Sequence, residues 1–137
     1  MTYFTISTTS RSLYWVDSRS NKATIKKSSL TGSNEEIILS SLELQSPRSL
    51  IVKGKFLYWM DRITKRRRGG FKLEKYNINT KLKETVCSSH NTTMQPFAMD
   101  ISDKGDFVYV SDWHNMVVWK LKLNTTDDKR YRIILLE

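Results

Sequence analysis

The chain has little of several residue types on which whole classes of protein depend. It has a single cysteine, Cys87, so an internal disulfide framework and a zinc site built on paired cysteines are excluded. Its two histidines, His90 and His114, are too few for a histidine-based metal centre. No apolar run approaches the roughly 18 residues of a membrane helix. Residues 1–9 lack the basic start and apolar core of a signal peptide, so neither feature is predicted.

Cys87 itself permits two interpretations. In a strand it behaves as a small buried hydrophobe. Its disulfide partner could instead lie in sequence outside this chain, and a single cysteine does not decide the compartment.

Acidic residues are fewer than basic residues in this chain. Lysine and arginine number 23 against 14 aspartates and glutamates, which gives a net charge of +9. Such a balance favours an acidic partner: a protein, a heparin-like glycan or an anionic membrane surface. A nucleic-acid partner is not predicted, because no nucleic-acid-binding motif is present and the aromatic residues fall inside apolar runs, where they cannot stack on bases.

What the chain does have is a repeated segment. The three runs Leu13–Asp17, Leu57–Asp61 and Val108–Asp112 each join apolar and aromatic residues to a final aspartate, and their tyrosines are 44 and 51 residues apart. A recurrence at that period indicates a repeat architecture.

Each repeated segment is flanked by similar short runs. An apolar run precedes it, and two more follow after polar gaps, all rich in β-branched and aromatic residues. Apolar residues at consecutive positions indicate strands buried on both faces, as in a stack of sheets. The sequence therefore predicts an all-β fold of three four-stranded propeller blades in one domain, 1–137, with repeats at about 1–40, 41–88 and 89–137. Five repeat aromatics are expected to be buried: Tyr14, Trp15, Tyr58, Trp59 and Tyr109.

These residues resemble a known family. Leu13-Tyr14-Trp15-Val16-Asp17, then Ile25 to Asn34 with Leu30-Thr31-Gly32-Ser33-Asn34, then Ser46 to Leu50 is similar to the YWTD repeat, the class B repeat of the low-density-lipoprotein receptor family. Val110, Thr31 and Ser49 depart from its pattern. Residues 62–70 form an enlarged gap after one aspartate, and in this the chain resembles insect cueball-type proteins, which also carry a lengthened segment there.

The resemblance implies a six-bladed propeller in the extracellular part of a receptor-type protein, with a binding rather than a catalytic role and no cofactor or metal. Three blades are half of six. The chain is therefore expected to be a fragment of a larger protein, or to close a ring as a homodimer. Alternatives are an enzyme of the six-bladed lactonase or esterase type, and a non-functional gene fragment.

The enzyme alternative needs converging acidic and amide residues on the innermost strands, where the sequence offers chiefly Asp100. Ser111-Asp112-Trp113-His114 contains the residue types of a catalytic triad, but four neighbours at a strand end do not supply its geometry. The repeated aspartates Asp17, Asp61 and Asp112 are read as structural. Each unit carries the same one, whereas catalysis needs different residues in different roles.

A candidate partner-binding surface comes from strand alternation. Turns after the second strand of each repeat should share one end of the stack, which places Arg66, Arg67 and Arg68 beside Trp113 and His114. The simpler interpretation of the arginine run is a solvated loop. Asn91 and Asn124 each begin a glycosylation acceptor pattern in a predicted loop.

Overall fold

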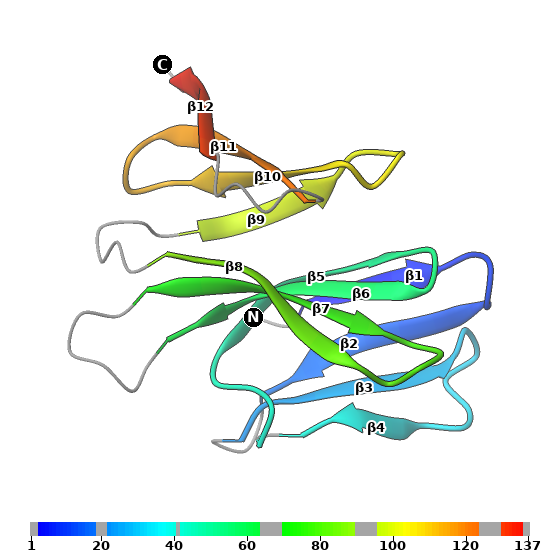
Figure 1. Cartoon of the computed structure of the whole chain (residues 1–137). Helices are drawn as coiled ribbons and strands as arrows, with labels where there is room; N and C mark the ends of the chain where they lie inside the picture. The colour runs from blue at the N-terminus through cyan, green and yellow to red at the C-terminus, as the bar shows by residue number, and fades with distance from the viewer. Residues whose placement is uncertain are drawn as a thin grey trace.

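The structure, a computed structural model, describes residues 3–18, 22–40, 42–63, 70–89, 96–123 and 130–135. Over these residues the chain is all β. The described part of the chain contains no helix that could span a membrane. Twelve strands form three antiparallel four-stranded sheets, which lie face to face in chain order (Figure 1). The sequence prediction of three stacked four-stranded blades is therefore confirmed.

The strands of each blade follow one another in sequence. Blade 1 contains β1 (Phe4–Ser7), β2 (Ser12–Asp17), β3 (Thr24–Ser29) and β4 (Glu36–Leu39). Blade 2 contains β5 (Pro47–Lys53), β6 (Phe56–Arg62), β7 (Phe71–Asn77) and β8 (Lys83–Ser89). Blade 3 contains β9 (Pro96–Ile101), β10 (Phe107–Asp112), β11 (Val117–Lys122) and β12 (Arg130–Leu135).

Each blade has two faces that the repeated segment distinguishes. Side chains alternate along a strand, so the tyrosine and the tryptophan of one segment point to opposite sides of the sheet. In blade 2, Trp59 packs in a core with blade 1 and Tyr58 packs in a core with blade 3. We call the two sides the Trp face and the Tyr face of a blade, and each interface joins the Tyr face of one blade to the Trp face of the next.

The two cores have the same construction. Between blades 1 and 2, Tyr14, Val16 and Ile25 meet Leu57 and Trp59. Between blades 2 and 3, the buried side chains are Tyr58, Met60, Leu73, Met99, Ile101, Val108 and Val110. Consecutive apolar residues in β6 are explained by this arrangement, since both faces of blade 2 are covered.

Hydrogen bonds also join the blades along their innermost strands. The Val52 N–H donates to Thr5 Oγ1 at 3.2 Å, and the Met99 N–H donates to Ser49 Oγ at 3.1 Å. Ser49 sits at a bulge in β5 with φ of 55°, a conformation that turns its hydroxyl toward blade 3.

Three of the five repeat aromatics are buried as expected, with exposed fractions of 0% for Tyr14, 5% for Tyr58 and 0% for Trp59. Trp15 and Tyr109, expected to be buried with them, are instead partly exposed. The reason is their position: Trp15 is on the Trp face of blade 1 and Tyr109 on the Tyr face of blade 3. Within the described residues, no further sheet covers either face.

The outermost strand of every blade is irregular at an equivalent place. A bulge interrupts the pairing of β3 with β4, of β7 with β8 and of β11 with β12. In each blade the bulge lies at the third-strand residue that pairs with Trp15, Trp59 or Val110, the equivalent positions of the second strands. These third-strand residues are Lys26, Glu74 and Trp119.

Candidate binding surface

One end of the blade stack gathers the turns that follow the second strands. β2, β6 and β10 all end there, at the left of Figure 1, and β5 and β9 begin there. We call this the loop end. Ile63 N–H donates to the Gly70 carbonyl at 2.8 Å, which closes the base of the 64–69 loop at this end. Arg66, Arg67 and Arg68 themselves lie outside the described residues, as do both glycosylation candidates, Asn91 and Asn124.

Trp113 and His114 lie at the loop end, in the turn between β10 and β11. The Trp113 side chain is 66% exposed, His114 is also exposed, and Met116 two residues later is 50% exposed. Exposed tryptophan side chains are enriched among the residues that dominate protein-binding surfaces.

The carboxylate of Asp112 stabilises this turn through hydrogen bonds. It is fully buried and accepts hydrogen bonds from Asn115 Nδ2 at 2.6 Å, the Asn115 N–H at 3.3 Å and Trp119 Nε1 at 3.1 Å. The carboxylate thereby holds both ends of the turn to β11, and Trp113 and His114 project beyond it.

Phe97 is a member of this surface that the sequence did not indicate. It lies where β9 is bulged against β10, since Ala98 pairs with Ser111 and Pro96 with Asp112. The bulge turns its ring outward, and Phe97 is 53% exposed. In the run Pro96-Phe97-Ala98-Met99 nothing in the alternation marks a bulge, so the sequence does not indicate that Phe97 is exposed. Leu42, in the connection between blades 1 and 2, is a further exposed apolar side chain at the loop end, at 94%.

The other repeated aspartates are also engaged by the chain. Asp61 is fully buried and accepts the Ser46 N–H at 2.6 Å and the Gln45 N–H at 3.0 Å, which ties the connection before β5 to the end of β6. Asp17 pairs with Lys26 Nζ at 3.0 Å. Asp100, the acid on the innermost strand, is exposed and accepts the Ile101 N–H at 2.8 Å. Among the described residues, no three histidine, cysteine or acidic side chains lie close enough to share a metal ion.

Burial gives Asp61 a pH-dependent effect on stability. Desolvation raises the pKa of its carboxyl above the ordinary 3.8, and the hydrogen bonds from Gln45 and Ser46 oppose this more weakly. The folded state therefore binds this proton more tightly than the unfolded chain. It follows that the contribution of Asp61 to the free energy of unfolding falls as the pH rises from 3.8 through the raised folded pKa.

We expect Asp61→Asn to remove that fall, because the amide does not titrate. Urea unfolding of both proteins between about pH 3 and pH 7 measures the effect. The free energy of unfolding of the variant relative to wild type should increase across this range. A difference that decreases with pH would contradict the assignment.

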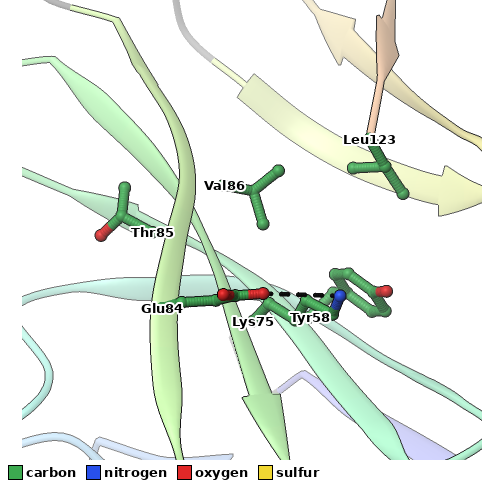
Figure 2. Close-up of a pocket in the computed structure, with 6 residues that line it drawn as sticks. All are labelled: Tyr58, Lys75, Glu84, Thr85, Val86 and Leu123. Carbon is green, nitrogen blue, oxygen red and sulfur yellow. Dashed lines mark ion pairs between the residues drawn. The ribbon is translucent and has the colours of Figure 1, made fainter. Parts of the chain in front are cut away.

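A pocket of about 210 Å³ lies between blades 2 and 3, away from the loop-end turns (Figure 2). It is lined by Tyr58, Lys75, Glu84, Thr85, Val86 and Leu123. Lys75 Nζ pairs with Glu84 Oε1 at 3.5 Å and lies 4.0 Å from the centre of the Phe56 ring. Burial, followed by the nearby Glu84 charge, raises the pKa of the Tyr58 hydroxyl above its ordinary value of 10.0. The two charged side chains of the pocket, Lys75 and Glu84, pair with each other.

Comparison with known proteins agrees with the fold. Residues 11–52 match the family model of the low-density lipoprotein receptor repeat class B. This match runs from β2 to β5, so it spans three strands of blade 1 and the innermost strand of blade 2. No curated protein sequence matches the chain.

Solved structures with the same fold are distant in sequence. The chain is similar to one in a nidogen/laminin complex (TM-score 0.58, 15% identity, 95% of this chain and 62% of that one). It is also similar to TolB of Acinetobacter baumannii (0.71, 9%, 95% and 31%) and to a periplasmic gluconolactonase of Pseudomonas aeruginosa (0.59, 12%, 88% and 39%). The chain thus spans less than two thirds of each of these proteins, and at such identities the likeness shows the fold alone. Residues 11–52 are therefore similar to a low-density lipoprotein receptor class B repeat, and they lie within three blades of a β-propeller fold.

Proposed function

We propose that this chain is a non-catalytic binding module of an extracellular or receptor-type protein, and that its loop end contacts an acidic protein or acidic glycan. The class B repeat supports the kind of module. The observation that carries the choice of surface is the turn after β10. There a buried aspartate holds the backbone while Trp113, His114 and Met116 are left exposed.

Charge supports the same surface. The chain has a net charge of +9, and its densest basic run, Lys65 to Arg68, begins just past the end of β6. Long-range attraction of this kind speeds the encounter with an acidic partner, while exposed aromatic side chains supply short-range contact area once the partner is bound.

A lactonase-type enzyme is the alternative, because gluconolactonases are among the structures with this fold. The acids that such a site would use are engaged here by the chain itself. Asp61 and Asp112 are buried under N–H donors, and Asp100 accepts the backbone N–H of its neighbour. This arrangement favours binding over catalysis.

Reversing the charge of Arg66, Arg67 and Arg68 to glutamate should slow association with an acidic partner by about tenfold or more and flatten its salt dependence. Thermal stability should change little, because the sequence predicts a solvated loop at these positions. Surface plasmon resonance with immobilised heparin and a panel of acidic receptor ectodomains, at several salt concentrations, measures both quantities.

The matched control makes the same change in net charge at the opposite end of the stack: Lys55→Glu, Lys81→Glu and Lys104→Glu, all exposed in turns there. The control should keep most of the association rate. If the two triple variants lose binding equally, only net charge matters, and the loop end has no special role.

The aromatic contribution has its own test. Trp113→Ala should speed dissociation of a bound partner by roughly 30-fold, the effect of losing a hot-spot side chain worth about 2 kcal/mol. Leu82→Ala serves as the control, because Leu82 is 71% exposed in the turn between β7 and β8 at the opposite end. Equal dissociation rates for the two variants would remove Trp113 from the binding surface.

A further inference from the structure

Within the part of the chain that the structure describes, the Trp face of blade 1 is an apolar surface that no other sheet covers. Phe4, Ile6 and Ile37 are 65%, 49% and 60% exposed, and they lie around Trp15 and Leu13 on neighbouring strands. The pairing partners show what these positions require. In blade 2, Leu50 pairs with Trp59 across neighbouring strands, just as Phe4 pairs with Trp15 in blade 1. Leu50 is nevertheless only 4% exposed. In blade 3, Ile101 pairs with Val108 as Ile6 pairs with Leu13 in blade 1. Ile101 is also only 4% exposed.

Soluble proteins seldom leave contiguous apolar surface of this kind open to water. The buried counterparts in blades 2 and 3 differ in one respect: the Tyr face of another blade packs against each of them. The side chains of the Trp face of blade 1 are therefore suited to a Tyr face.

The Tyr face of blade 3 is the free surface of the matching kind. Its Lys120 Nζ lies 4.1 Å from the Phe107 ring centre and 5.8 Å from that of Tyr109. In blade 2, Lys75 Nζ lies 4.0 Å from Phe56 and 6.0 Å from Tyr58, the same arrangement at equivalent positions.

The arrangement in blade 2 is covered, because Phe56 and Tyr58 pack with Val108, Val110 and Leu121 of blade 3. Blade 3 thus has the same lysine–aromatic contacts as blade 2. In blade 2 these side chains pack against the Trp face of the next blade. Among the described residues, these two faces are the ones that no other blade covers, and they are of complementary kinds.

We propose that a second copy of this chain covers both faces, with the Tyr face of blade 3 in each copy packed on the Trp face of blade 1 in the other. The contact is heterologous, so it closes only if rotation brings the two copies round to one another. With the three described blades from each copy, the dimer is a ring of six. The occupant is a second copy because, within the described residues, each covered Trp face is covered by a Tyr face of this same chain.

The proposal is independent of the proposed binding function, since neither face includes residues 113–116. Sedimentation equilibrium of the 137-residue chain should give twice the mass of one chain at micromolar concentration. A monomer throughout the micromolar range would overturn the proposal, and so would a mass that keeps growing with concentration, because an open array would then replace the ring.

Two variants separate the halves of the contact. Phe4→Asp with Ile37→Asp places carboxylates on the Trp face of blade 1, at positions already exposed within the chain, so folding should persist. Tyr109→Glu places a carboxylate on the Tyr face of blade 3, opposite Lys120 in the strand pairing, which can neutralise it within the chain. Each variant alone should be monomeric, because every contact in its dimer would either place unpaired carboxylates against apolar side chains or lack the Tyr109 ring.

Mixing the two variants is the decisive measurement. In a mixed pair, one contact carries both altered faces and the other carries neither, so one wild-type contact is restored. The mixture should form heterodimers while each variant alone stays monomeric, with circular dichroism showing that both remain folded. Wild-type dimerisation in either single variant, or no association in the mixture, would overturn the head-to-tail arrangement.

Discussion

Replacing Trp59 by alanine should lower the free energy of unfolding by roughly 3–5 kcal/mol, the range for truncating a large buried aromatic side chain and leaving a cavity. Trp59 is 0% exposed and lies in the core between blades 1 and 2, where Leu57, Tyr14 and Val16 surround it. Truncation would remove contacts from two blades at once. Urea unfolding followed by circular dichroism measures the loss.

Trp15→Ala is the matched control, because Trp15 occupies the same position in blade 1 but is partly exposed. Measured at a concentration where the chain is monomeric, it should cost clearly less. Trp59→Phe should also cost much less than alanine, since the ring volume is mostly kept and Trp59 Nε1 has no hydrogen-bond partner to lose. Equal losses for Trp15→Ala and Trp59→Ala would show that the interface between blades 1 and 2 is not packed as described.

The second large effect is expected at Asp61. Asp61→Ala should lower the free energy of unfolding by about 2–4 kcal/mol at neutral pH, because a buried donor left without its acceptor costs about 1–3 kcal/mol. The change would leave the N–H groups of Gln45 and Ser46 without their acceptor beneath the connection between blades 1 and 2. The same urea titrations give the value.

Asp17→Ala provides the comparison from blade 1. Its partner Lys26 keeps a second carboxylate, Glu35, at 3.1 Å, so no buried cation is left unpaired. The loss should therefore be smaller than at Asp61. Should Asp17→Ala cost as much as Asp61→Ala, the backbone hydrogen bonds would not be what makes the strand-end aspartate stabilising.

The fold was largely predictable because its signal is local and repeated. Three Tyr-containing segments ending in aspartate give the blade count, and four consecutive apolar residues at 57–60 indicate a sheet covered on both sides. Exposure at Trp15 and Tyr109 was not predicted, because the repeat makes these residues look like Trp59 and Tyr58. Only their place at the ends of the stack distinguishes them.

The binding surface was predictable in part. Strand alternation places Trp113 and His114 at the end where the 64–69 loop starts, and the structure has them exposed there. Phe97 could not be found in this way, because its exposure depends on a bulge set by pairing with Ser111 and Asp112, residues distant in sequence. The donors that satisfy each aspartate were likewise invisible, since they are backbone groups in one blade and side chains in another.

The bulges in the outermost strand pairs bear on the tendency of this chain to form fibrils. An unpaired strand at the rim of a sheet can template the addition of further strands without limit, and a bulge that twists the rim discourages such growth. Exposed charges at Glu36 on β4, and at Lys83 and Glu84 on β8, add to the barrier. These features disfavour self-association through the backbone hydrogen bonds of the rims. A side-chain contact that closes into a ring limits the number of partners, whereas strand addition at a rim has no such limit.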